Sequence, residues 1–211
     1  MVRYIILDVS SGSEEYIFKD KKCYTYELRY ALEEYDTARE IGEFMVDSSA
    51  DFTYSHNIYL ADGKETFCAE DATAQLRDSG NGFSMLRDSD TPLMERLHWD
   101  SPDSLCVVNS FASKGNFDEF DGHTNNYVRF FKYNEWISAR DKFSVGQLKS
   151  ALSQEFVNQG NKDGEASVDN VRSKGTSQII IIDYHTGNMQ VCFTSHEGPS
   201  DDVIFTDVGN Y

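Results

Sequence analysis

Proline, basic residues and long apolar runs are all scarce in this chain of 211 residues, which contains only 3 Pro. No apolar run approaches the ~18 residues that a membrane-spanning helix needs, so we expect no interaction with the membrane interior. The 19 Lys and Arg stand against 36 Asp and Glu, which gives a net charge of −17. So acidic a chain argues against nucleic-acid partners and against anionic membranes, because both need a basic surface.

Cysteine is also sparse and widely spaced. The four cysteines, Cys23, Cys68, Cys106 and Cys192, form no C-x-x-C pair, which argues against zinc ribbons and dithiol redox sites. The short apolar stretch after Met1 lacks a small-residue cleavage site, so we read no signal peptide. We therefore expect reduced thiols and a cytoplasmic protein.

Motifs for metals and cofactors are missing as well. The five histidines have no ligand-like spacing, and the acidic loops around Gly122 and Gly164 fail at the first and twelfth calcium-ligand positions. The chain has no phosphate-binding P-loop, no dinucleotide-binding glycine pattern and no G-x-S-x-G nucleophile motif. We therefore predict no metal and no cofactor.

Local patterns predict a mixture of strands and helices. Asp62-Gly63-Lys64 lies between two apolar runs and predicts a β-hairpin. Thr37 with Glu40, and Ser144 with Gln147, have the spacing of capping boxes that open helices. Residues 71–103 are expected to be mostly loop. The predicted strands are 2–8, 14–18, 53–61, 65–70, 104–111, 177–184, 190–194 and 203–205, and the predicted helices are 25–35, 37 onward, 92–97, 124–143 and 144–158.

Grouped strands followed by paired helices indicate an α+β fold, in which helices cover an antiparallel sheet. Residues 179–182 are four consecutive Ile, which predicts a strand buried on both faces between layers. The length suits one domain or a large piece of one, and we found no internal repeat and no convincing linker.

Five segments in order carry a family resemblance. They are Leu28–Glu33 followed by Asp36–Glu40, the hairpin Asn57–Gly63 that leads to Glu70, Val107–Phe111, Asn126-x-x-Arg129-Phe130, and Ser177–Asp183 with its hairpin. This order resembles the C-terminal part of the linear-amide N-terminal-nucleophile hydrolases, a group that includes choloylglycine hydrolases, acid-ceramidase-like amidases and penicillin acyltransferase-like enzymes. The resemblance covers roughly residues 25 to 206, and no single motif is specific alone.

The resemblance implies a four-layer αββα sandwich with mostly antiparallel sheets, and an enzyme that cleaves linear amide C–N bonds or transfers the acyl group. In that family an N-terminal cysteine is the nucleophile and its own α-amine, which titrates near ~7.7–8.0, is the base. By motif match, Asn109 would donate to the oxyanion, although Val108 replaces the family's threonine. Arg129 would support the site electrostatically, although Asn126 replaces the family's serine.

Structural interpretations of the same residues stay open. An asparagine at a strand end, such as Asn109, is usually a turn or bulge residue. An arginine early in an aromatic helix, such as Arg129, usually forms a surface ion pair in so acidic a chain. Asp62 and Glu70 are read as structural residues at the turn and at the end of the strand.

The main departure from the family is the nucleophile. Val2 follows Met1, and Cys23 leads into a predicted helix, whereas the family cysteine opens a strand. We therefore expect residues 1–211 to be a single or partial domain, the C-terminal portion of such a hydrolase, truncated before its catalytic N-terminal portion and inactive alone. Because strand edges would be left unpaired, we also expect self-association or a partner chain.

Two functions follow as hypotheses. In the first, the chain is a module of a linear-amide hydrolase or acyltransferase, which acts on a small-molecule amide when an N-terminal portion completes it. In the second, it is a non-catalytic acidic binding or interaction protein derived from that fold. An unrelated α/β domain with coincidental motifs is the third alternative. The acyl and amine groups of a substrate cannot be read, and residues 71–103 and 112–123 are the candidate selectivity loops.

Overall fold

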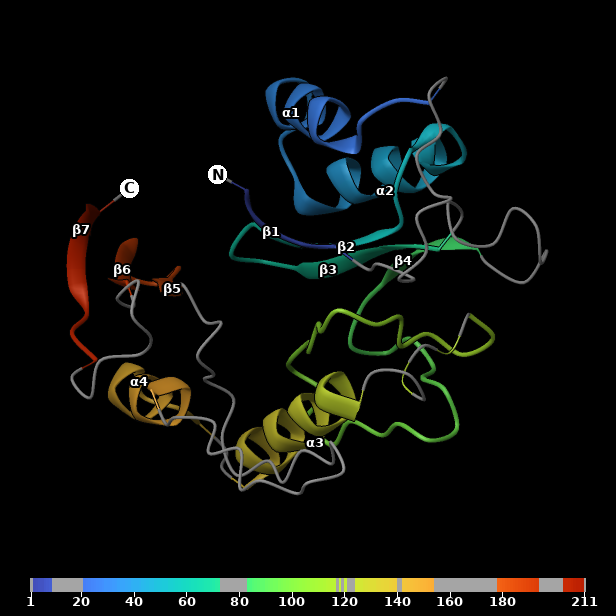
Figure 1. Ribbon diagram of the computed structural model, residues 1–211. Coiled ribbons are helices and arrows are strands. Elements are labelled where there is room, and N and C mark those ends of the chain that lie inside the picture. The colour runs from blue at the N-terminus through green and yellow to red at the C-terminus, as the bar shows by residue number, and fades with distance from the viewer. Residues whose placement is uncertain are drawn as a thin grey trace. The chain divides into compact units, whose positions relative to one another are not determined.

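The computed structural model describes residues 2–8, 21–72, 83–116, 118, 120, 124–139, 142–153, 178–193 and 203–210. These residues form four α-helices and two antiparallel sheets of four and three strands, neither of which closes (Figure 1). They divide into two compact units, Met1–Asn126 and Tyr127–Tyr211. The predicted mixture of helices with antiparallel sheets is therefore confirmed, whereas the four-layer sandwich stays a prediction.

The first unit contains the four-stranded sheet. Its strands are β1 (Arg3–Asp8), β2 (His56–Ala61), β3 (Thr66–Asp71) and β4 (Ser84–Arg87), in the order β1-β2-β3-β4. The predicted hairpin joins β2 to β3, and its turn is closed by Asp62, whose Oδ1 accepts the backbone N–H groups of Lys64 at 2.9 Å and Glu65 at 3.0 Å. Gly63 has a φ of 86°, a conformation that favours glycine in a tight turn.

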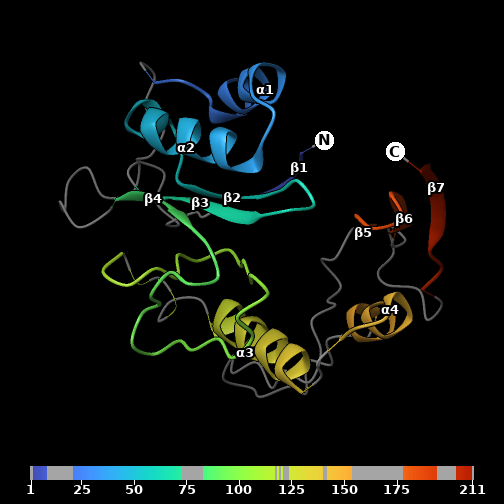
Figure 2. The same ribbon diagram turned by 180° about the vertical axis from the view of Figure 1, so that it is seen from behind.

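Helices α1 (Tyr24–Glu34) and α2 (Ala38–Ser48) cover one face of this sheet, and η2 (Ser49–Asp51) follows α2 (Figures 1 and 2). The predicted capping box is present, since the Thr37 hydroxyl accepts the Glu40 N–H and the Glu40 carboxylate accepts the Thr37 N–H. Asp62 Oδ2 also accepts the Ala38 N–H at 3.1 Å, so one carboxylate holds both the hairpin turn and the start of α2. The shared core is apolar and buried; it includes Leu28, Ala31, Ile41, Met45, Phe52, Ile58, Leu60, Phe67 and Ala69.

The other face of the sheet carries polar residues, because side chains alternate between the two faces of a strand. Asn57 pairs with Glu70 across β2 and β3, and Cys68 pairs with Arg87 across β3 and β4, so these four side chains share the face turned away from α1 and α2. The chain that follows β4 runs along this face (Figure 1). All four of these side chains are buried.

The second unit contains most of α3 (Thr124–Ser138), together with α4 (Val145–Ser153) and the sheet β5 (Gln178–Asp183), β6 (Asn188–Phe193) and β7 (Thr206–Asn210). The second predicted capping box is also present, because the Ser144 hydroxyl accepts the Gln147 N–H at 3.2 Å. Lys149 Nζ of α4 lies 5.0 Å from the centre of the Phe205 ring. The four isoleucines of β5 do not form a strand buried on both faces, since Ile180 is 40% exposed while Ile179 and Ile181 are buried.

Several predicted elements are wrong. Residues 84–87 form β4 instead of loop, since a four-residue strand is too short for its alternation to stand out. Residues 92–97 contain a bridge at Leu93 and a short turn instead of a helix, and residues 104–111 contain one isolated bridge, between Val108 and Ser110, instead of a strand. The last strand covers 206–210, not 203–205. The predicted strand 14–18 and the end of the helix after residue 153 lie outside the described residues.

Candidate functional site

The expected oxyanion residue, Asn109, lies on the segment Cys106–Ser113. This segment is hydrogen-bonded to Asn57, Glu70 and Arg87 on the polar face of the four-stranded sheet. Its neighbours Val108 and Ser110 are buried, at 3% and 1% exposure, whereas Asn109 itself is partly exposed. The segment bends at Asn109 and, among the described residues, pairs with other backbone only near its end, where Met94 N–H donates to the Ala112 carbonyl, so most of its backbone groups need partners from side chains.

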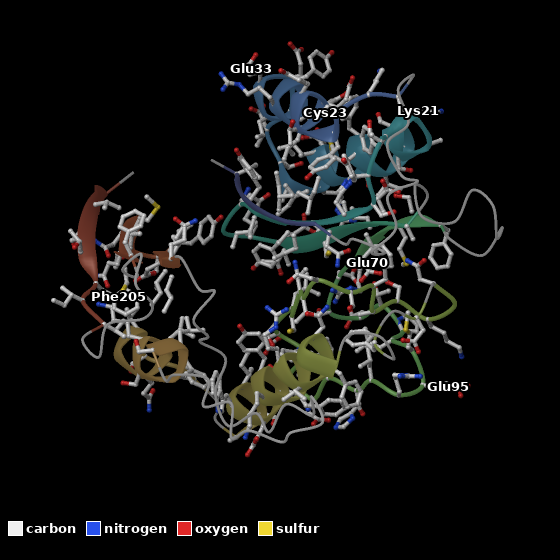
Figure 3. All side chains as sticks on the ribbon, in the orientation of Figure 1. Lys21, Cys23, Glu33, Glu70, Glu95 and Phe205 are labelled. Atoms are coloured by element: carbon white, nitrogen blue, oxygen red, sulfur yellow. The ribbon has the colours of Figure 1, made fainter. Side chains whose placement is uncertain are left out.

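A buried ion pair provides some of those partners. Arg87 Nε donates to Glu70 Oε1 at 2.6 Å, and the two side chains are 3% and 0% exposed. The Glu70 carboxylate also accepts the backbone N–H groups of Ala112 at 3.1 Å and Ser113 at 3.2 Å. The Arg87 guanidinium donates to the Cys106 carbonyl at 2.9 Å. The pair therefore holds the segment at both of its ends (Figure 3 labels Glu70).

The charges of this pair stabilise each other. Burial, the largest single influence, would lower the pKa of Arg87, but the charge and hydrogen bond of Glu70, together with the nearby Cys68 and Cys106, raise the pKa overall. The guanidinium is therefore a permanent buried cation, and the carboxylate beside it has a partner for its charge. Such a pair destabilises a protein strongly when one member alone is removed, because the other charge stays buried without a counter-ion.

Two asparagines hold the middle of the segment. Asn57 Nδ2 donates to the carbonyl oxygens of Val108 at 2.9 Å and Ser110 at 3.1 Å, the residues on either side of Asn109. Asn126 Nδ2 donates to the Asn109 carbonyl at 2.9 Å and to the Ser110 hydroxyl at 2.8 Å. Both asparagines are buried, so the backbone around Asn109 is fixed by donors that water does not compete for.

Arg129 lies on α3, three residues after Asn126, and is partly buried. Positions three apart lie on the same side of a helix, so the motif Asn126-x-x-Arg129 presents both residues along one helix face. Asn109 and Asn126 belong to the first unit and Arg129 to the second. The structure thus brings Asn109 and Asn126 together, and the convergence of Arg129 with Asn109 stays a prediction.

The thiols differ sharply in their environments. Burial raises the pKa of Cys68 to about 12, although the nearby Arg87 guanidinium acts in the opposite direction. A thiol with so high a pKa is protonated at neutral pH and is a poor nucleophile. Cys23 is exposed at the N-cap of α1, where its Sγ lies 3.0 Å from the Thr25 hydroxyl. Figure 3 labels Cys23 at this end of α1 and Glu33 near the opposite end.

A second buried polar pair lies on the helix-covered face of the sheet. His56 Nδ1 is 3.6 Å from Asp71 Oδ2 and 3.1 Å from the Tyr54 carbonyl. The imidazole stacks on Tyr24, with 4.2 Å between the ring centres. Aromatic walls and a carbonyl acceptor make this a packed structural histidine. No cluster of His, Cys, Asp or Glu among the described residues could hold a metal ion.

Asn57, Glu70, Arg87 and Asn126 together form a buried hydrogen-bond network around the segment Cys106–Ser113. Sequence reasoning missed two of these four residues, Asn57 and Arg87. Asn57 was part of the hairpin motif without a role, and Arg87 lay in a region predicted to be loop. A polar amide inside an apolar strand is a usable signal, because a buried side-chain amide requires hydrogen-bond partners. The structural interpretations of Asp62 and Glu70 agree with their contacts, which hold a turn and an ion pair respectively.

Comparisons with protein-family models, with curated proteins and with solved structures found no match for this chain. Within the described part of the chain, no helix combines the length and the apolar character needed to span a bilayer. The relation to the amide hydrolases therefore remains a proposal that the contacts must support.

Proposed function

We propose that this chain is a module of a linear-amide hydrolase or acyltransferase, and that it supplies the oxyanion-binding part of the site. One observation carries the proposal. The backbone of the segment that presents Asn109 is held by hydrogen bonds with four buried side chains, those of Asn57, Glu70, Arg87 and Asn126. A donor that is fixed before the substrate arrives stabilises developing negative charge without reorganising during the reaction.

In this proposal the Asn109 amide donates a hydrogen bond to the carbonyl oxygen of the amide substrate as that oxygen becomes negative. Arg129 contributes positive charge, which persists at any working pH. The attacking thiolate comes from a polypeptide segment outside the 211 residues, since none of the four cysteines matches the family's nucleophile. The substrate is a small-molecule amide, and the protein works in the cytoplasm together with a partner chain or a second copy.

The test measures the cleavage of a panel of acyl p-nitroanilides. The full chain is assayed alone and together with the polypeptide encoded directly upstream of its gene. We expect cleavage only in the combination, and Asn109→Ala should lower kcat there by about 10²–10³-fold, as for other oxyanion donors. Gln178→Ala, which removes an exposed side-chain amide from β5, is the matched control and should leave kcat unchanged.

Two results would count against the proposal. Equal kcat values for Asn109→Ala and the unmodified chain would remove the oxyanion role. Labelling of Cys23 by a thiol-reactive amide probe, with cleavage by the chain alone, would place the nucleophile inside these residues.

The second candidate is a non-catalytic acidic binding protein derived from the same fold. The engagement of Glu70 and Arg87 with each other and with the backbone favours this candidate, because neither group is then available for acid–base chemistry. The raised pKa of Cys68 favours it too. Absence of cleavage in the combination, with retained binding of a partner, would select this function.

A further inference from the structure

Strand β1 is an edge of the four-stranded sheet. Among the described residues it pairs with β2 alone, through the register Arg3↔Ala61 to Asp8↔His56. An edge strand directs alternate backbone N–H and C=O groups outward, where they can pair with another extended chain. Tyr4 and Ile5, at the centre of this strand, are uncharged and are 48% and 50% exposed, so no described residue buries either of them.

A cavity of about 480 Å³ lies beside this edge. It is lined by Val2 and Tyr4 on the strand side and by Arg29, Leu32, Glu33, Tyr35 and Asp36 on α1 and just after its end. The volume is within the range of roughly 300–1,000 Å³ found for ligand pockets. A strand added at β1 would place every second side chain on the face that carries Tyr4, and hence toward this cavity.

The charges around the cavity favour a positively charged side chain as its ligand. The Glu33 carboxylate is paired with Arg29, so those two charges cancel and Asp36 leaves a net negative charge. The cavity also borders the C-terminal end of α1, which carries partial negative charge and has no basic residue in its last turn. Tyr4 and Tyr35 add aromatic rings, which attract cations. A lysine or arginine side chain complements all three features.

We propose that a basic partner polypeptide docks here, adding an extended segment to the β1 edge and placing a lysine or arginine side chain in the cavity beside Asp36. A second copy of this chain is the weaker occupant, because each copy carries a charge of −17 and would bring the same acidic cavity to the contact. The proposal does not depend on amide cleavage.

The test starts with a display library of random hexapeptides selected against the full chain. We expect enrichment of Lys or Arg within β-branched sequences. A selected peptide should bind Asp36→Asn about three- to fivefold more weakly than the unmodified chain, as the loss of one exposed ion pair predicts. Asp90→Asn, which neutralises an exposed carboxylate in the turn after β4, is the matched control and should not change the affinity.

Hydrogen exchange locates the peptide on the strand. In the full chain alone, those amides of Tyr4 to Leu7 that do not pair with β2 should exchange fast, and saturation with the peptide should slow them. Replacing the basic residue of the peptide by norleucine should weaken binding about tenfold, because it removes both the ion pair and the contact with the rings.

Four outcomes would overturn the proposal: no enrichment of basic residues, unchanged affinity for Asp36→Asn, slow exchange of the outward amides before any peptide is added, or a dimer in sedimentation that Ile5→Lys abolishes. The last outcome would identify a second copy as the occupant.

Discussion

Replacing Glu70 by glutamine tests whether the buried ion pair holds the Asn109 segment. The change keeps the size of the side chain but removes its charge. It weakens the 2.6 Å bond from Arg87 and leaves one amide oxygen to serve the Ala112 and Ser113 N–H groups, which now each use a carboxylate oxygen. Arg87 would stay buried without a counter-ion. Removal of one member of such a pair typically destabilises a protein by about 3–5 kcal/mol.

The surface provides a matched control for this change. Arg39 and Glu65 form an ion pair of 2.7 Å, close in length to the buried one, but their side chains are 48% and 45% exposed. Glu65→Gln is the same chemical substitution in a pair that water and salt screen. It should leave the unfolding midpoint nearly unchanged. The comparison therefore separates the buried network, which is the ion pair with its two backbone N–H bonds, from an exposed ion pair of similar length.

Urea unfolding followed by tryptophan fluorescence measures both variants. Trp99 lies in the first unit, where its Nε1 donates to the Ser104 carbonyl, and Trp136 lies in the second unit. In a Trp136→Phe background, Trp99 reports on the first unit alone. A loss of 3–5 kcal/mol is a large part of the about 5–15 kcal/mol that stabilises a typical domain. Equal midpoints for Glu70→Gln and Glu65→Gln would show that the buried network does not hold the segment.

Two further predictions concern the same sheet. Gly42→Ala would normally stabilise α2, but the added methyl group would collide with the Leu86 side chain. We therefore expect the free energy of unfolding, measured in urea, to fall by about 1–3 kcal/mol. A rise in that free energy would show that Leu86 moves aside freely. The pKa of Cys68, about 12 when folded against 9.0 ordinarily, means that its thiol favours folding fully below pH 9 and that this contribution is lost as the pH rises toward 12. Thermal melts between pH 8.5 and 11 should therefore show a steeper decline for the unmodified chain than for Cys68→Ala, and parallel declines would contradict the raised pKa.

Local chemistry made part of this fold predictable. The hairpin at Asp62-Gly63 and both capping boxes depend on contacts within a few residues, so they could be recognised from spacing alone. The strand predicted over residues 104–111 failed for a different reason. The apolar residues of that segment resemble a strand, but its carbonyl groups are bound by the side chains of Asn57 and Arg87 instead of by a neighbouring backbone. Contacts across 19 to 53 residues leave no local pattern.

The candidate site was accessible from the sequence only in part. Asn109 could be selected from a short motif, whereas the residues that hold it come from β2, β3, β4 and the start of α3. Asn126 illustrates the difference. In the motif it is a departure from serine, yet in the structure its amide contacts both Asn109 and Ser110, at 2.9 and 2.8 Å. A side-chain amide reaches farther than a hydroxyl and offers two N–H donors, which suits Asn126 to both contacts.

Why four buried polar side chains support one short segment is the question that connects stability to function. Apolar residues of similar volume often stabilise a core as well as a buried ion pair does, so stability alone does not require Glu70 and Arg87. An apolar core could not hold this segment in the same way, because most of its N–H and C=O groups lie outside a strand ladder and would be buried without hydrogen bonds. The network is therefore suited to fixing the position of the segment, in which Asn109 is the partly exposed residue with a polar side chain. This is the reason for testing Asn109 as a functional donor and Glu70 as its distant support.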